Sequence, residues 1–168
     1  MKLVIVSDTH MPRMAKKLPR RLIQELKDAD GILHAGDWVD LSVLELLEAY
    51  APTDGVAGNN DGRAIIAKFG LRKVLQYGDI RIGLVHGHGS NSRESTENNA
   101  FAEFAKDRVD AIIFGHSHIP LLKERNGIMM FNPGSATDKR RQPLYSFGIL
   151  RIEEGKLNAE LVTYEDKS

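Results

Sequence analysis

The chain has 168 residues, of which 42% are hydrophobic, with 23 basic residues, 23 acidic residues and no cysteine. The absence of cysteine excludes disulfides and thiolate chemistry, and a formal net charge of zero provides no overall field that would recruit nucleic acid or an anionic membrane. This length and apolar content predict a single domain over residues 1–168 with a substantial core.

The first two thirds of the chain alternate short apolar runs with helical patterns, which is typical of an α/β sheet. In chain order we expect a strand at residues 2–7, a helix at 18–27, a strand at 31–34, a helix at 42–50 and a short strand at 55–58. A hairpin at 73–76 with 79–85 and a longer helix at 94–108 follow. The last of these carries an apolar stripe at helical spacing, formed by Ala100, Phe101, Phe104 and Ala105. The stripe predicts a helix face packed against the core.

The rest of the chain has the pattern of short strands joined by tight turns. After an apolar run at 110–114, the expected strands are residues 121–125, 128–131, 145–152 and 156–162. Asn126-Gly127 is typical of a type I′ hairpin, and Glu154-Gly155 indicates another turn. Together with the earlier strands, this pattern predicts an α/β fold with two packed mixed sheets flanked by helices, a four-layer αββα sandwich.

Aspartates, asparagines and histidines follow the apolar runs, at the points where strands give way to loops. In chain order these groups are Asp8-Thr-His10, Gly36-Asp37, Gly58-Asn59-Asn60-Asp61, His86-Gly-His88 and Gly115-His116-Ser-His118. Residues two apart on an extended segment point the same way. Because open α/β sheets bind ligands at one edge, we expect these side chains to serve one small volume.

A set of imidazole, carboxylate and amide groups without thiolate suits Mn, Fe, Zn, Ni or Co better than a structural zinc site or a calcium site. Two ions about 3.5 to 4 Å apart need a bridging carboxylate, and such pairs characteristically hydrolyse phosphate esters. Asp37 is the candidate for the bridge. Each motif alone has a simpler interpretation as a turn or a cap, so the prediction depends on their joint order.

The ordered set D-x-H, G-D, G-N-x-D, H-G-H and G-H-x-H, ending with Asn132-Pro-Gly-Ser135, resembles the calcineurin-like metallophosphoesterases, and among them the small single-domain phosphodiesterases of bacteria and archaea. The resemblance runs along the whole chain. It implies the αββα sandwich and a metal-dependent phosphodiesterase with two divalent ions. Manganese is the expected metal, with Ni, Zn, Fe, Co or Mg as alternatives. The implied reaction is attack on phosphorus by a metal-bound water or hydroxide.

The same resemblance implies a set of site residues. The implied ligands of the first ion are Asp8, His10 and His118, those of the second are Asn59, His86 and His116, and Asp37 bridges both. The residues expected to take part in catalysis are Asp37, Asn59, Asn60 and His88. Of these, His88 would approach a phosphate oxygen or donate a hydrogen bond to it.

One position departs from the larger phosphomonoesterases of this superfamily, which carry histidine as the third residue of G-N-H-D. Here that residue is Asn60. An amide can donate a hydrogen bond to a phosphoryl oxygen but cannot pass a proton to a leaving group. This difference favours a small or nucleotide-like phosphodiester as substrate. Phosphomonoesters and nucleotide pyrophosphates stay open as alternatives.

A function of a different class is also open, because the eukaryotic retromer subunit of the same fold serves as a non-catalytic interaction platform. Damage to the ligand set, above all loss of the bridging carboxylate, would indicate such a scaffold. This chain retains Asp37 and Asn59. The enzyme is therefore the favoured interpretation.

Several other residues have competing interpretations. His34, inside an apolar run, predicts a buried side chain that is hydrogen-bonded to backbone. Trp38 either packs to hold its loop or stacks on a base of the substrate. The basic clusters at 16–21 and 139–141 are either solvated surface or a guide for phosphate. The family resemblance places Asn132 and Ser135 near the metal cleft, where they would help to shape it.

No segment approaches the roughly 20 apolar residues that span a bilayer, and residues 3–6 are too short for the core of a signal peptide. We therefore expect a cytoplasmic protein with no membrane partner. Nucleic acid is not an expected partner. The resemblance implies that a homo-oligomer, a dimer or a tetramer, could complete the walls of the cleft.

Overall fold

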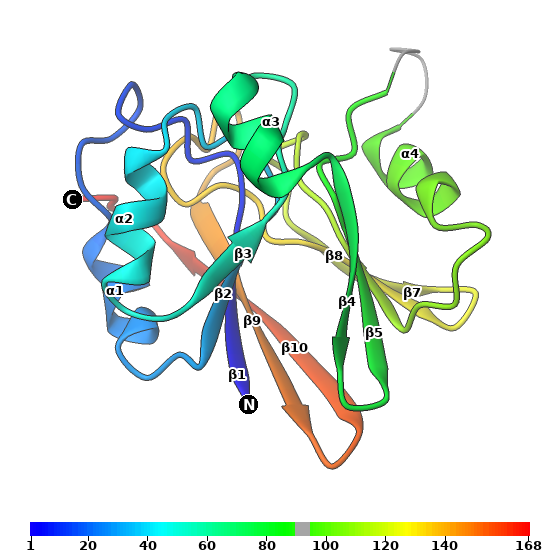
Figure 1. The fold of residues 1–168 in the computed structure, drawn as a ribbon. Helices are drawn as coiled ribbons and strands as arrows, with labels where there is room; N and C mark the ends of the chain where they lie inside the picture. The colour runs from blue at the N-terminus through cyan, green and yellow to red at the C-terminus, as the bar shows by residue number, and fades with distance from the viewer. Residues whose placement is uncertain (90–94) are drawn as a thin grey trace.

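The computed structural model describes residues 1–89 and 95–168, and within them two five-stranded sheets lie face to face (Figure 1). The first sheet has the order β10-β9-β1-β2-β3, formed by Lys156–Tyr164, Tyr145–Glu153, Lys2–Val6, Gly31–His34 and Thr53–Gly55. The second has the order β4-β5-β6-β8-β7, formed by Arg72–Tyr77, Ile80–Val85, Ala111–Ile113, Ile128–Asn132 and Leu121–Arg125. Each contains parallel and antiparallel pairs, so both sheets are mixed.

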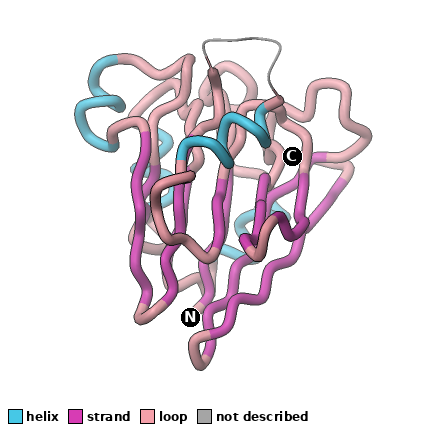
Figure 2. The backbone as a smooth tube through the Cα atoms, turned by 90° about the vertical axis from the view of Figure 1, so that its right-hand side faces the viewer, coloured by secondary structure: helices cyan, strands magenta, loops and turns pink. Residues whose placement is uncertain are grey.

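Helices cover the outer faces of the two sheets, and this arrangement confirms the predicted fold class. The helices are α1 (Arg20–Leu26), α2 (Ser42–Glu48), α3 (Arg63–Phe69) and α4 (Thr96–Glu103). The first three share an apolar cluster with the first sheet, and α4 packs on the second sheet. Figure 2 shows α4 lying across the strands of that sheet.

Alternation along β1 shows how the strands build these layers. Leu3 and Ile5 point into the central cluster between the sheets, whereas Val4 and Val6 belong to the cluster under the helices. A third cluster, between the second sheet and α4, includes Phe104. Three apolar clusters therefore separate the four layers.

Three elements differ from the sequence-based expectation. The helix α3 was not predicted, and β3 ends at Gly55 instead of covering residues 55–58. The helix expected over 94–108 ends at Glu103, and its expected first residue, Glu94, lies outside the described residues. Within the expected stripe, Ala100 and Phe104 are buried but Ala105 is exposed, because the helix has already ended before that residue.

The tight turns of the C-terminal part follow the prediction. Asn126 and Gly127 have φ values of 51° and 78°, and Glu154 and Gly155 have φ values of 51° and 73°. Positive φ at both central residues is the requirement of a type I′ turn. These turns set the registers of the β7–β8 and β9–β10 hairpins.

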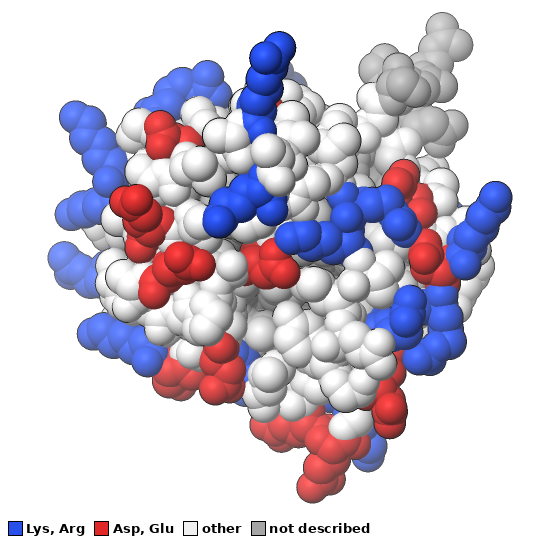
Figure 3. Space-filling model, viewed as in Figure 1, with Lys and Arg blue, Asp and Glu red and all other residues white. Residues whose placement is uncertain are grey.

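The surface carries charges of both signs interspersed over the face shown in Figure 3, as the balanced composition suggests. In the two described stretches of the chain, no helix has the length and hydropathy needed to cross a bilayer.

Candidate metal centre

The predicted ligand motifs meet because parallel strands of both sheets end at one edge of the sandwich. Asp8 follows β1 and Asp37 follows β2, both in the first sheet. His86 follows β5, and His116 with His118 follows β6, both in the second sheet. This edge lies at the top of Figure 1, where the loops gather.

Ligand atoms from these loops surround one small volume. Asp37 Oδ2 lies 3.4 Å from Nε2 of His10 and 3.3 Å from Nε2 of His86. Asp8 Oδ1 lies 3.5 Å from Nε2 of His118 and 3.6 Å from Nε2 of His86. Two ligands about 2.1 Å from one cation would lie roughly 3.0 to 3.4 Å apart. The observed spacings are close to that requirement.

These atoms form two overlapping groups that could each hold a metal ion. Asp8, His10 and His118 form the first group, and Asp8, Asp37 and His86 form the second. Asp8 therefore belongs to both groups, whereas the sequence-based prediction placed it only at the first ion. Asp37 Oδ2 lies beside Nε2 of both His10 and His86, one histidine from each predicted ligand set.

Four potential metal-ligating atoms that face this volume make no hydrogen bond among the described residues. Asp8 Oδ1 and the Nε2 atoms of His10, His86 and His118 are buried without a hydrogen-bond partner. Buried polar atoms are usually paired, because an unpaired one costs about 1 to 3 kcal/mol. A cluster of such atoms with carboxylate and imidazole chemistry fits a divalent cation.

In two of these histidines the other ring nitrogen, Nδ1, is hydrogen-bonded to a backbone carbonyl. His86 Nδ1 donates to the carbonyl of Ala35 at 2.7 Å, and His118 Nδ1 donates to the carbonyl of Asp138. Since a carbonyl can only accept, these bonds place the ring proton on Nδ1 and direct the Nε2 lone pair into the cleft. Both imidazoles are thereby fixed in the tautomer that a metal ligand needs.

The two carboxylates are oriented in the same manner. Asp8 Oδ2 accepts hydrogen bonds from the Ser7 hydroxyl at 2.8 Å and from the His116 backbone at 2.9 Å. Asn60 donates from its backbone to Asp37 Oδ1 at 2.9 Å and from its amide to Asp37 Oδ2 at 2.8 Å. Asn60 thus contacts the candidate bridging oxygen directly.

The loops that deliver these side chains have unusual backbone conformations. Five of the seven predicted ligands have a positive φ, namely Asp8, His10, Asp37, His116 and His118. Such conformations are uncommon outside glycine and cluster at functional sites. Gly58 is needed for a different reason, since a Cβ there would lie 2.1 Å from Asp37 Oδ1.

Protonation in the metal-free protein follows from this geometry. Burial disfavours a charged His86, but the neighbouring carboxylates of Asp37 and Asp8 outweigh it and raise the pKa of His86 to about 9. Burial also favours the neutral form of Asp37, but the nearby His86 ring and the hydrogen bonds from Asn60 outweigh it and lower the pKa of Asp37. Burial lowers the pKa of His10 below its usual value, which favours the neutral imidazole.

The remaining predicted residues lie at the rim of the same cleft. His116 Nδ1 is 3.2 Å from Asn59 Oδ1, and the ring centroids of His116 and His86 are 5.2 Å apart. His88 lies 5.5 Å from His86 by ring centroids, and its Nδ1 is buried without a described partner. The fold therefore brings every predicted site residue to one place.

Asp61 has a role that the sequence did not reveal. Its Oδ2 accepts from the backbone N–H of Asp37 and of Gly58, each at 2.8 Å, and its Oδ1 accepts from Val39 at 2.7 Å. One carboxylate thus joins the loop after β2 to the loop after β3. The position of Asp61 at the end of G-N-x-D was the only signal, and a turn explains that motif equally well.

The loop at 132–138 supports the site, as the resemblance implied. The Ser135 hydroxyl donates to the carbonyl of Asp8 at 2.7 Å, and the Thr137 hydroxyl donates to that of Thr9 at 2.6 Å. The Asn132 amide donates to the carbonyl of Gly115 at 3.0 Å. These bonds hold the loops after β1 and β6 in place.

His34 and Trp38 form part of a buried stack beside the centre. Gly36 N–H donates to His34 Nδ1, and the His34 ring stacks on Trp38 with centroids 3.9 Å apart. Trp38 also stacks on Phe69 and is fully buried. The prediction for His34 is confirmed. The suggestion that Trp38 stacks on a substrate base is wrong, because no face of the indole is accessible.

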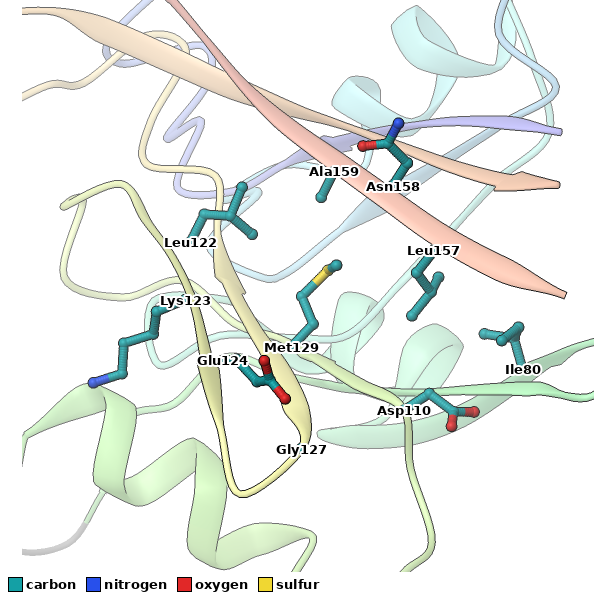
Figure 4. A pocket seen from close by; sticks show the side chains of 10 residues that line it. All are labelled: Ile80, Asp110, Leu122, Lys123, Glu124, Gly127, Met129, Leu157, Asn158 and Ala159. Carbon is teal, nitrogen blue, oxygen red and sulfur yellow. The ribbon is translucent and has the colours of Figure 1, made fainter.

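A separate groove of about 490 Å³ lies between β10 and the β7–β8 hairpin (Figure 4). The side chains of Leu122, Met129 and Leu157 point into it. Its lining contains none of the predicted ligands, so the groove is distinct from the candidate metal centre.

Comparisons with known proteins agree with this geometry. The model of the calcineurin-like phosphoesterase superfamily domain matches residues 1–155. A probable metallophosphoesterase of Methanothermobacter thermautotrophicus is 33% identical over 158 residues, which cover 94% of this chain and 90% of the relative. A phosphodiesterase of Methanocaldococcus jannaschii is 26% identical, with 80% and 83% of the two chains covered.

The fold also matches solved structures. Vps29 of Entamoeba histolytica, determined in complex with zinc, superimposes with a TM-score of 0.77 over 97% of this chain and 99% of that one. Its sequence identity is 24%, so this likeness concerns the fold alone. The extent of the family match and the identity to the archaeal relative show that the chain belongs to the calcineurin-like phosphoesterase superfamily.

Proposed function

We propose that the chain is a metal-dependent phosphodiesterase that hydrolyses a small or nucleotide-like phosphodiester at a pair of divalent cations. The observation that carries this proposal is the convergence of four buried atoms that have no hydrogen-bond partner among the described residues. Nε2 of His10 and of His86 lie beside Asp37 Oδ2, and Nε2 of His86 and of His118 lie beside Asp8 Oδ1. The relative of Methanocaldococcus jannaschii that is named a phosphodiesterase supports the substrate class.

The ligands would divide between the two ions as the motifs suggest. The proposed ligands of one ion are Asp8, His10 and His118, those of the other are Asn59, His86 and His116, and Asp37 lies between. When bound, the two cations would lower the pKa of a water and neutralise charge on the phosphoryl oxygens. Manganese is the proposed metal, although Ni, Zn, Fe, Co or Mg also suit this ligand set.

The protein itself contributes fixed lone pairs and hydrogen-bond donors. The carbonyls of Ala35 and Asp138 keep the Nε2 lone pairs of His86 and His118 directed into the cleft. His88 sits at the rim, and burial together with the nearby His86 lowers its pKa. A neutral His88 has one N–H that can donate to a phosphoryl oxygen.

Asn60 supports a diester over a monoester. Its amide is engaged with Asp37 Oδ2, and an amide cannot protonate a leaving alkoxide. Simple monoesters of alcohols with a high pKa would gain the least from this site.

The test starts from metal-stripped protein, to which Mn, Ni, Zn or Mg is added singly, with hydrolysis measured on bis-p-nitrophenyl phosphate and p-nitrophenyl phosphate. We expect metal-dependent cleavage that favours the diester and is abolished by Asp37→Asn, with the exposed turn variant Asp79→Asn as the control. Faster turnover of the monoester would instead support a phosphomonoesterase. Tight metal binding without turnover of either ester would support a non-catalytic scaffold.

A further inference from the structure

The residues at the C-terminal end of β10 and just after it lie against two loops of the metal centre. Lys167 Nζ donates to the carbonyl of Met14 at 2.7 Å and to that of Thr137 at 3.0 Å. The Tyr164 hydroxyl donates to the carbonyl of Ala136 at 2.6 Å. These contacts come from residues beyond 155, where the match to the family model ends.

Of the two loops that Lys167 contacts, one carries His10 of the first ligand group and the other orients His118 of the same group. The Met14 N–H donates to the carbonyl of His10 at 2.8 Å, so Met14 closes the turn that begins at this histidine. Thr137 precedes Asp138, whose carbonyl holds the Nδ1 proton of His118. The ammonium of Lys167 therefore joins the loop that presents His10 to the loop that orients His118.

The loops of the other ligand group are held by different contacts. His86 is fixed by the carbonyl of Ala35, which belongs to neither loop that Lys167 contacts. The backbone of His116 is linked to those loops only indirectly, through Asp8. A change at Lys167 is therefore expected to affect the His10 and His118 ligand group more than the His86 and His116 group.

We propose that Lys167 is a positioning residue that sets the spacing between His10 and His118 and thereby the cation affinity of their ligand group. This inference rests on the proposed function of that group as a metal site. An ammonium suits the role because it carries three donors and no acceptor. Its stem is half-buried, and Nζ lies 5.6 Å from the centroid of the Tyr145 ring.

The sign of the effect separates this role from a simple effect of charge. A positive charge repels a cation bound nearby, so an effect of charge alone means that removing Lys167 tightens metal binding. Loss of the two carbonyl contacts instead leaves the loops joined by the Ser135 and Thr137 hydroxyls and loosens the spacing between them. Positioning therefore predicts weaker binding when the charge is removed.

The test is calorimetric titration of the metal-stripped full chain with Mn²⁺, comparing wild type, Lys167→Met and Lys167→Arg. The variant His10→Ala identifies which binding step belongs to the first group. We expect Lys167→Met to weaken that step by about tenfold, as is usual for residues that orient metal ligands, and to leave the other step unchanged. Arginine also donates to two carbonyls, so Lys167→Arg should restore the affinity, and Lys156→Met, at an exposed position of β10, should match wild type.

Three results would overturn the inference. Unchanged or tighter binding by Lys167→Met would exclude positioning. Equal weakening of both steps, with a lower melting temperature, would indicate a general structural role. Absence of Mn²⁺ binding by the wild-type protein would contradict the proposed function itself, which distinguishes that failure from failure of the lysine contact.

Discussion

Asp61 offers the sharpest test of how the centre is assembled, because one carboxylate accepts three backbone hydrogen bonds from two loops. Two of these donors, the N–H groups of Asp37 and Gly58, are buried, and the third, of Val39, is partly buried. An orphaned buried donor costs about 1 to 3 kcal/mol. Asp61→Ala should therefore lower the free energy of unfolding by about 2 to 6 kcal/mol, the sum for the two buried donors.

Asp61→Asn should lower the free energy of unfolding much less than Asp61→Ala does. Both buried donors share the single oxygen Oδ2 of Asp61, and the carbonyl oxygen of asparagine can take that place. Only the bond from Val39 is then lost, because the amide nitrogen cannot accept it. We expect a loss of about 1 kcal/mol, the usual net value of one hydrogen bond.

Guanidinium unfolding of the metal-free variants measures these values directly, provided that the slope of free energy against denaturant is the same for each. Asp79→Ala, in the exposed turn between β4 and β5, is the control for loss of an aspartate. Equal losses for the alanine and asparagine variants would refute the role of the shared oxygen. A loss below about 1 kcal/mol for Asp61→Ala would mean that water replaces the carboxylate.

Two further predictions concern the chemistry of the centre. Asn60→His should raise the ratio of monoester to diester turnover, because it restores a proton donor near the leaving group; an unchanged ratio of kcat/KM values for the two chromogenic esters would remove this explanation. The raised pKa of His86, about 9 against an ordinary 6.5, means that its protonation stabilises the metal-free fold fully below pH 6.5 and that this contribution is lost as the pH rises through 9. The free energy of unfolding without metal should therefore fall between pH 6.5 and 9, while apparent Mn²⁺ affinity rises over the same interval, because the ligand must lose its proton. If the free energy of unfolding and the apparent Mn²⁺ affinity both rose or both fell over this interval, the raised pKa of His86 would be contradicted.

The composition of the centre could be predicted because each motif follows an apolar run, and parallel strands place their carboxyl ends together. His86 and His118 come from the second sheet and Asp8 and Asp37 from the first, yet they meet because both sheets end at the same edge. The alternation of Val4 and Val6 with Leu3 and Ile5 likewise made the layers predictable. Local pattern and global fold agree at these positions.

The prediction failed where tertiary contacts override local pattern. The helix α3 has seven residues and no side-chain cap at its N-terminus, and it is held mainly by Ile65 and Phe69 in the core under the helices. An isolated helix of that length is not stable by itself. Residues 56–58 were expected in a strand, but only the Val56 N–H still donates to β2, at the carbonyl of His34. The N–H of Ala57 donates to the carbonyl of Gly70 and that of Gly58 donates to Asp61, so neither continues the pairing with β2.

The cleft keeps a geometry that is costly at several of its own residues. The positive φ of five predicted ligands is unfavourable, and so is the lack of a hydrogen-bond partner, among the described residues, for Asp8 Oδ1 and for Nε2 of His10, His86 and His118. A relaxed loop would turn Asp8 or His118 toward a backbone donor and remove that cost. It cannot do so, because the second atom of each side chain is already bound, Asp8 Oδ2 by Ser7 and His118 Nδ1 by the carbonyl of Asp138. The hydrogen bonds behind the ligands, more than the ligands themselves, therefore keep the cleft in a geometry that a cation can enter without reorganising it.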